Sequence, residues 1–388
     1  MVTRIDRQIP LAVPLVGEHE AESVRRCVES GWVSTAGPWV GRFERGVADY
    51  LGVPHAVATC NGTAALHIAL LAAGVQPGDL VLVPDLTFIA PVNAIRYCGA
   101  EPVFVDVDAD RWQMDPAAVR EFLITQTVRD DGFYRERQSG RAIRAMLPVH
   151  LLGLPVPVDE LRSLAGEFGL AFVQDAAQGF SGQYKGRKIG TLGGVTTFSF
   201  NGNKIVTCGA GGVVVTDDDE VARRAQYLTT QAKDDALYFR HDHVGFNYRL
   251  SSLNAALGLA QLERIDDFLA TKRRIYARYR EALAHRGDLR WVEEAAGDRA
   301  SYWLASFVMD GGRDRRDRVL RALIESGIEA RPPWQANHTQ QPYRRNLHGT
   351  ITHSLAIVDA GLHLPSSVSL SDDDQCFVID TLEKALGA

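Results

Sequence analysis

The chain has 388 residues, enough for a large core and for two domains in one subunit. Its formal net charge of −6 provides no basic face, so a nucleic-acid-binding protein is not expected. No apolar stretch reaches membrane-spanning length, and the N-terminus lacks the apolar core of a signal peptide. The five cysteines are scattered and lack CxxC spacing, so we expect reduced thiols, no metal site and a cytoplasmic protein.

Short apolar runs alternate with helical segments through the first 250 residues. Continuous apolar runs are typical of strands that are buried on both faces of a sheet. The alternation with helices predicts an α/β domain with a mainly parallel sheet, in which ligands bind at the carboxyl ends of the strands. We expect seven strands, at 53–60, 80–84, 102–107, 145–150, 171–175, 195–200 and 212–216.

The segments between these runs include four expected helices and one insertion. The stretch 126–143 is polar and without periodicity, so it is interpreted as an irregular surface insertion. The helices are expected at 63–73, 89–98, 158–168 and 219–229.

The pattern changes after residue 250 and predicts a second, smaller domain. One long helix is expected through 251–284, with Ser251 or Ser252 as its cap, and it is too long for a compact βα unit. The last hundred residues mix expected strands at 302–309 and 328–331 with helices at 315–326 and 371–386. We therefore divide the chain into an N-terminal segment that packs with the small domain, a large domain, an interdomain helix and a small α+β domain, at 1–30, 31–250, 251–285 and 286–388.

Lys204 is the strongest candidate for a catalytic residue. It ends the β-rich run Phe198-Ser-Phe-Asn-Gly-Asn-Lys204, and a glycine-rich turn follows at 209–212. A lysine that loses hydration has a lowered pKa, which favours the neutral amine that a Schiff base needs. This points to the cofactor pyridoxal 5′-phosphate (PLP). The other five lysines lie in surroundings typical of solvated charge: Lys185, Lys188, Lys233, Lys272 and Lys384.

A phosphate-binding turn is expected where the first strand meets a helix. Gly62, Thr63 and Ala64 open that helix, and free N–H groups at a helix N-terminus attract anions. Gly62 permits close approach of the backbone, and the Thr63 hydroxyl can add a hydrogen bond. Ser199, at another strand end, can offer a second hydroxyl to the phosphate. The alternatives are an ordinary capped turn and a serine that bonds locally.

Two polar residues at a further strand end suit the cofactor ring. Asp175 ends an expected strand, and a buried carboxylate there would keep the pyridinium nitrogen protonated so that the ring accepts electrons. Gln178, on the same turn, can bond the phenolic oxygen. The alternative for Asp175 is a strand-end residue that caps the next turn. Phosphate cup, ring acid and Lys204 follow one another along a single sheet, and this combination is more specific than any one of them.

Seven motifs together resemble the DegT/DnrJ/EryC1/StrS family of sugar aminotransferases. The resemblance runs nearly from end to end and implies a PLP-dependent transferase of fold type I, with a large domain and a smaller one. Segments 198–204 and 230–235 are most similar to the branch that makes 4-amino sugars from UDP-linked 4-keto-6-deoxyhexoses, in the UDP-N-acetylbacillosamine and legionaminic acid pathways, with the GDP-perosamine synthases nearby. The motifs span 31–35, 61–66, 84–90, 175–178, 198–204, 245–249 and 331–334.

The resemblance implies roles for two further cofactor contacts. Phe88 would stack on the cofactor ring, although a core aromatic is the alternative. Asn247 would reach from a neighbouring subunit to the phosphate, which implies a homodimer with shared active sites.

The resemblance also suggests substrate contacts. Arg249 and Arg331 are candidates for binding a dicarboxylate amino donor, because a guanidinium matches a carboxylate bidentately. His338 is expected near the active site. Ser34 and Thr35 are candidates for contact with the sugar. Surface salt bridges and a turn next to a helix are the alternatives for these residues.

We therefore expect an aminotransferase that moves the amino group of glutamate, through the pyridoxamine form of the cofactor, to the keto carbon of a UDP-linked 4-keto-6-deoxy sugar. Other acceptors stay open: a different keto sugar or a cyclitol, linked to GDP, to dTDP or to no nucleotide. A PLP-dependent sugar dehydratase of the same fold would carry histidine in place of Lys204. A non-catalytic regulator would not be expected to keep the whole set of site residues.

Overall fold

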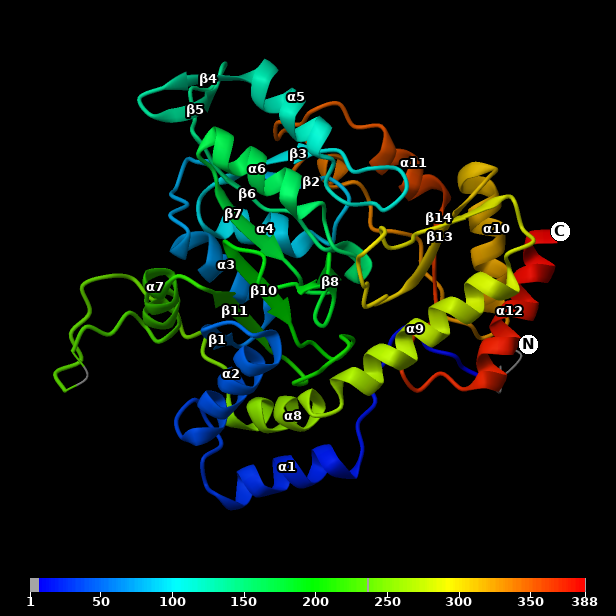
Figure 1. Cartoon of the computed structure of the whole chain (residues 1–388), viewed down its shortest axis with the longest axis horizontal. Coiled ribbons are helices and arrows are strands. Elements are labelled where there is room, and N and C mark those ends of the chain that lie inside the picture. Colours follow the sequence, from blue (N-terminus) through cyan, green and yellow to red (C-terminus); the bar gives the residue numbers. More distant parts are fainter. Residues whose placement is uncertain (1–6, 236, 388) are drawn as a thin grey trace.

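The computed structural model describes residues 7–235 and 237–387. A seven-stranded sheet forms the centre of the larger part of the chain (Figure 1). Neighbouring strands are parallel, except that β11 is antiparallel to both β1 and β10. The expected α/β fold with a mainly parallel seven-stranded sheet is confirmed. In spatial order the strands are β1 (His55–Thr59), β11 (Gly212–Thr216), β10 (Val195–Ser199), β7 (Ala171–Asp175), β6 (Ile143–Met146), β2 (Leu80–Pro84) and β3 (Glu101–Val105).

Helices cover both faces of this sheet, as its uninterrupted apolar strands require. In β2, Leu80 and Leu82 join one core cluster, whereas Val81 and Val83 join another, because successive side chains point to opposite faces. The first cluster contains residues of α2 (Pro38–Leu51), α5 (Pro116–Gln126), α6 (Val158–Phe168) and α8 (Ser252–Leu262). The second contains residues of α3 (Gly62–Ala72), α4 (Ile89–Tyr97) and α7 (Asp219–Thr229).

Strand β11 brings the ends of β1 and β10 together. Its first residue, Gly212, pairs with Thr59 of β1 and with Ser199 of β10. A Cβ on Gly212 would lie 2.4 Å from the Asn61 carbonyl oxygen, which is closer than atoms can approach, so only glycine fits. The start of α3, which follows β1, therefore lies beside the end of β10.

The long helix expected at 251–284 is in fact two helices, α8 and α9 (Ile265–Ala282). Arg264, between them, has non-helical backbone angles and pairs with Glu20. Asp266 and Asp267 occupy the first turn of α9, where acidic side chains stabilise a new helix N-terminus. Helix α9 crosses from α8 to the C-terminal part of the chain (Figure 1).

The C-terminal part is built on a three-stranded antiparallel sheet. It contains β12 (Leu289–Trp291), β13 (Ala305–Met309) and β14 (Gly361–Leu364), with α10 (Gly312–Glu325), α11 (His353–Ala360) and α12 (Asp372–Gly387). The expected strand at 328–331 is wrong, because Ile328 and Arg331 form only isolated bridges, to Ile9 and His363. The strand expected at 302–309 begins at Ala305.

The N-terminal segment contacts both parts of the chain. Ile9 bridges to Ile328 in the C-terminal part. Helix α1 (Glu18–Glu29) instead packs against α8, where the Ser23 hydroxyl donates to the Ala256 carbonyl at 2.7 Å. The expectation that residues 1–30 pack with the smaller domain therefore fits the stretch around Ile9 but not α1, and residues 1–6 lie outside the described part. Figure 1 shows α1 alongside α8.

The insertion at 126–143 contains a β-hairpin rather than irregular chain. Strands β4 (Thr127–Asp130) and β5 (Phe133–Glu136) pair antiparallel. Asp131 and Gly132 form the turn, with φ of 47° and 81°. An Asp-Gly pair readily adopts positive φ and is a strong hairpin signal that the polar composition had obscured. A second, shorter hairpin joins β8 (Gln183–Tyr184) to β9 (Arg187–Lys188).

Lys272 is buried, contrary to the expectation that it is solvated. Only 4% of the residue is exposed, and its Nζ donates to the carbonyl oxygens of Trp303, at 2.8 Å, and Ser366, at 2.6 Å. It lies on the face of α9 that also buries Phe268, Ile275 and other apolar residues. Burial lowers the pKa of Lys272 to about 7.

Lys272→Met should change how stability depends on pH. Between about pH 7 and 10.5 the unfolded chain holds the Lys272 proton and the folded chain does not. Wild-type stability should therefore rise relative to the variant by up to about 1.4 kcal/mol per pH unit in that range. Urea unfolding of both proteins from pH 7 to pH 9.5 measures this difference. The exposed Lys384→Met is the control, and parallel profiles for wild type and Lys272→Met would contradict the lowered pKa.

Candidate active site

A cavity of about 310 Å³ opens at the carboxyl ends of the central strands. Its walls come from the turns after β1, β2, β7 and β10, and from Trp303 and Trp334 of the C-terminal part. Seven of the predicted site residues line this one cavity: Gly62, Thr63, Phe88, Asp175, Gln178, Ser199 and Lys204.

Lys204 presents its amine to the cavity. Its Nζ lies 4.3 Å from the centroid of the Trp303 ring, so the charged form gains a cation–π contact while it loses water. Burial lowers the pKa of Lys204 to about 8, although the nearby Asp175 carboxylate opposes the shift. Roughly a tenth of the molecules would then carry the neutral, nucleophilic amine at pH 7.

Asp175 is the last residue of β7, lines the cavity and is buried. The Ala177 N–H donates to its Oδ1 at 2.8 Å. Burial raises the pKa of Asp175 to about 6, against the effects of that hydrogen bond and of the Lys204 charge. A carboxylate this poorly hydrated gains most from a cationic ligand, such as a protonated ring nitrogen.

Gln178 is held with its amide group fixed in direction. The Leu152 N–H donates to Gln178 Oε1 at 2.6 Å, and the Ser301 hydroxyl donates to the Gln178 carbonyl at 2.8 Å. Because a backbone N–H must meet an oxygen, the Nε2 group is the one that remains to donate to a ligand.

The start of α3 forms an anion site, with one correction. The Ala64 N–H donates to the side chain of Asn61 at 2.8 Å, so the predicted contact of Ala64 with phosphate is not supported, and Ala64 does not line the cavity. Among the described residues, the amides of Gly62 and Thr63 donate to no protein acceptor. A Cβ on Gly62 would lie 2.8 Å from the Ser199 Cβ, so glycine keeps this cup open. The cup suits a phosphate group.

Aromatic rings form the outer wall of the cavity. Phe88 is 50% exposed, and its ring centroid lies 6.4 Å from that of Trp334. Trp334 and Trp303 are nearly parallel, with centroids 6.1 Å apart. The Trp303 Nε1–H donates to the Asn203 carbonyl at 2.7 Å, next to Lys204. The two tryptophans were not predicted as cavity residues, since their position depends on the packing of the C-terminal part.

Both arginines proposed for the amino donor lie outside the cavity lining. The Arg249 guanidinium forms a bidentate ion pair with Glu44, with Nη2 2.8 Å from Oε2. Arg331 is exposed and pairs with Glu329 at 3.0 Å. In this structure each guanidinium is engaged by a carboxylate of the chain itself.

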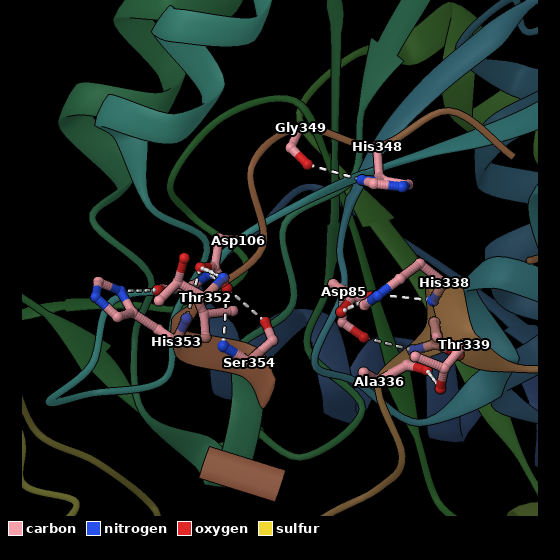
Figure 2. A network of polar contacts seen from close by, with 12 residues as sticks. Asp85, Asp106, Ala336, His338, Thr339, His348, Gly349, Thr352, His353 and Ser354 are labelled. Atoms are coloured by element: carbon pink, nitrogen blue, oxygen red, sulfur yellow. Dashed lines mark hydrogen bonds and ion pairs between the residues drawn. The ribbon is translucent and has the colours of Figure 1, made fainter. Parts of the chain in front are cut away.

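The remaining predicted contacts also lie outside the cavity lining. Ser34 and Thr35 are exposed, and the Ser34 carbonyl accepts from the Ser252 N–H. Asn247 is exposed and bridges through its backbone to Thr230. His338 directs its ring to Asp85, with Nδ1 2.8 Å from Oδ2 (Figure 2).

The sequence profile described as the DegT/DnrJ/EryC1/StrS aminotransferase family matches residues 14–383. The chain belongs to this family. It is 37% identical to the GDP-perosamine synthase of Caulobacter vibrioides, over 98% of both chains, and 35% identical to that of Escherichia coli O157:H7, over 97% of this chain and 98% of the other. It also resembles the crystal structure of DesI with its TDP-sugar product, with 31% identity, a TM-score of 0.86 and coverage of 98% and 94%.

Membership of the DegT/DnrJ/EryC1/StrS family confirms the expected enzyme class and cofactor: the protein is a PLP-dependent sugar aminotransferase. The bound cofactor supplies an aldehyde that condenses with amines and a ring that accepts electrons. The cavity fits it, because an amine, a buried carboxylate and an anion cup face one space.

Among the described residues, no helix has the length and apolar character to cross a bilayer, and no cluster of metal-ligating side chains occurs. All five cysteines are free thiols.

Proposed function

We propose that this enzyme transfers the amino group of glutamate to the keto carbon of a nucleotide-linked 4-keto-6-deoxy sugar, with a GDP-linked sugar as the first candidate. The single observation that carries the reaction class is the cavity in which Lys204, Asp175 and the α3 N-terminus meet. The choice of GDP is supported by the names of relatives that share 35–37% identity with the chain over most of its length, the GDP-perosamine synthases. A GDP-linked sugar therefore replaces a UDP-linked sugar as the first acceptor to test.

Each cavity residue has a distinct proposed role. Lys204 Nζ attaches the cofactor and, once free, carries a proton to and from the substrate carbon. Asp175 keeps the ring nitrogen protonated, and Gln178 Nε2 donates to the phenolic oxygen. The amides of Gly62 and Thr63, with the Ser199 hydroxyl, hold the phosphate. Phe88 covers one face of the ring.

A homodimer is also part of the proposal. The segment before Asn247 exposes four large apolar side chains, each between 66% and 84% exposed: Leu237, Tyr238, Phe239 and Val244. Single exposed apolar residues are ordinary, but a group of them on one segment supports an interaction surface. A second copy that covers this segment would let Asn247 reach the neighbouring phosphate cup.

An amination assay with glutamate and a panel of GDP-, UDP- and dTDP-linked keto sugars tests this function, with products identified by mass. We expect a glutamate-dependent amino sugar, with the highest kcat/KM for the GDP-linked acceptor. A higher value for UDP or dTDP would reject the nucleotide assignment alone. A deoxygenated sugar would indicate a dehydratase, and no product with any acceptor would reject the proposed function. Light scattering of the holoenzyme tests the dimer.

A further inference from the structure

A short segment of the C-terminal part is clamped onto the carboxyl end of β2. This segment, Ala336–Thr339, contains the 3-10 turn Asn337–Thr339, which lies beside Asp85 (Figure 2). Asn337 donates its backbone N–H to the Asp85 carbonyl at 3.0 Å, and its Nδ2 donates to the carbonyls of Asp85, at 2.8 Å, and Thr87, at 2.9 Å. His338 contributes its backbone N–H and its Nδ1, each 2.8 Å from a carboxylate oxygen of Asp85. We call these five contacts the β2 clamp.

The β2 clamp is buried, so its contacts are strong. Asp85 is fully buried and Asn337 nearly so. Burial raises the pKa of Asp85, and the bonds from His338 oppose that shift. Polar groups in such surroundings are costly to leave unpaired, so each of these contacts stabilises the position of the loop after β2.

The β2 clamp joins two walls of the cavity that are about 250 residues apart in sequence. Phe88 follows Asp85 by three residues, and Trp334 precedes Asn337 by three. Both rings line the cavity, yet Asp85, Asn337 and His338 do not. Thr87, between Asp85 and Phe88, also lines the cavity, and no described group bonds its buried hydroxyl. The clamp residues therefore do not face the active site themselves; they are joined to it through the backbone that carries Thr87 and Phe88 and through the backbone that carries Trp334.

We propose that Asn337 and His338 are positioning residues, which hold Asp85–Phe88 so that the Phe88 ring keeps its place over the cofactor. This inference rests on the stacking role proposed for Phe88. It gives His338 a different task from the substrate contact that the sequence suggested. Because the side chain of Asn337 bonds the carbonyls of both Asp85 and Thr87, it contributes most to the fixed position of this loop.

A double-mutant cycle on cofactor affinity tests this proposal. Asn337→Ala should raise the Kd for PLP about tenfold, the worth of one or two buried hydrogen bonds, and should weaken the visible circular dichroism of the bound cofactor. In a Phe88→Ala background the same change should have almost no effect, because the group that the clamp positions is gone. Additive effects in the two backgrounds, or unchanged Kd and dichroism in the single variant, would overturn the proposal.

Matched histidines provide the control. His338→Gln should also raise the Kd for PLP and weaken the dichroism, but less than Asn337→Ala does, since the backbone N–H at position 338 still bonds Asp85. His348→Gln should bind PLP like the wild type, because His348 is exposed, bonds Gly349 and lies beside His338 without joining the clamp (Figure 2). If Asn337→Ala does not fold, His338→Gln takes its place in the cycle. The cycle measures cofactor binding and dichroism, so absence of sugar amination would reject the proposed function without deciding this inference.

Discussion

Lys204→Ala is expected to abolish turnover. The proton transfer proposed for this amine contributes up to about 10⁴-fold, and the proposed attachment of the cofactor is lost with it, so the total loss should be about 10⁴-fold or more. The absorbance band of the lysine-bound cofactor should be absent from the variant. Since the pKa of Lys204 is lowered to about 8, attachment of PLP to the wild type should accelerate as the pH rises through 8. Stopped-flow absorbance measures this rate.

The control for this prediction is a lysine far from the cavity. Lys384 is exposed on α12, so Lys384→Ala should retain wild-type absorbance and turnover. Retained turnover in Lys204→Ala, or a rate of cofactor attachment that does not change between pH 7 and pH 9, would contradict the role of this amine.

Asp175→Asn should lower kcat by roughly 10²–10³-fold, the size of effect seen when one preorganised electrostatic partner is removed. Asparagine keeps the shape and can still accept the Ala177 N–H, so the fold should be retained. What is lost is the negative charge that we propose keeps the ring nitrogen protonated. Steady-state kinetics of the PLP-saturated enzymes measure the effect.

The pH dependence separates charge from shape at position 175. The pKa of Asp175 is raised to about 6, so its charge is lost as the pH falls through 6, and the affinity of the wild type for PLP should fall there. The affinity of Asp175→Asn for PLP should not fall in this pH range. The Asp175 charge has the opposite effect on the stability of the cofactor-free protein. A buried charge destabilises the fold above pH 6, so Asp175→Asn should unfold at an equal or higher temperature than the wild type at pH 7.

The exposed Asp159→Asn is the matched control, since Asp159 pairs with Lys185 on the surface. It should leave both kcat and the pH profile unchanged. If Asp175→Asn shares its profile with the wild type, the ionisation of Asp175 does not govern cofactor binding.

The sequence predicted the large sheet better than its connections. Apolar runs such as Leu80–Pro84 identify strands buried on both faces, but the same property hides strand direction, so the antiparallel β11 could not be distinguished. The break falls at Arg264, whose ion-pair partner, Glu20, is distant in sequence. The hairpin turn at Asp131-Gly132, by contrast, carried a local signal in the two residues themselves.

For the candidate site too, residues at strand ends could be predicted from the sequence, whereas residues whose position depends on distant partners could not. Asp175 and Ser199 are the last residues of β7 and β10, and Lys204 follows β10; parallel strands of one sheet bring their carboxyl ends to a common edge. Arg249 was expected to bind the amino donor because a guanidinium suits a carboxylate, yet Glu44 of α2 already pairs with that guanidinium. Trp303 has no local pattern that distinguishes it from a core aromatic.

The antiparallel strand β11 sets an order of events during synthesis. Ser199 stands beside Gly62 because Gly212 of β11 pairs with both β1 and β10. On the proposed site, the first 60 or so residues to leave the ribosome should therefore not retain the vitamin-derived cofactor by themselves. Its capture should wait until translation has passed Thr216, and Trp303 and Trp334 are made later still. Nascent chains stalled before β11 should therefore emerge in the apo form, and supply of the cofactor matters only for polypeptides that are already more than half made.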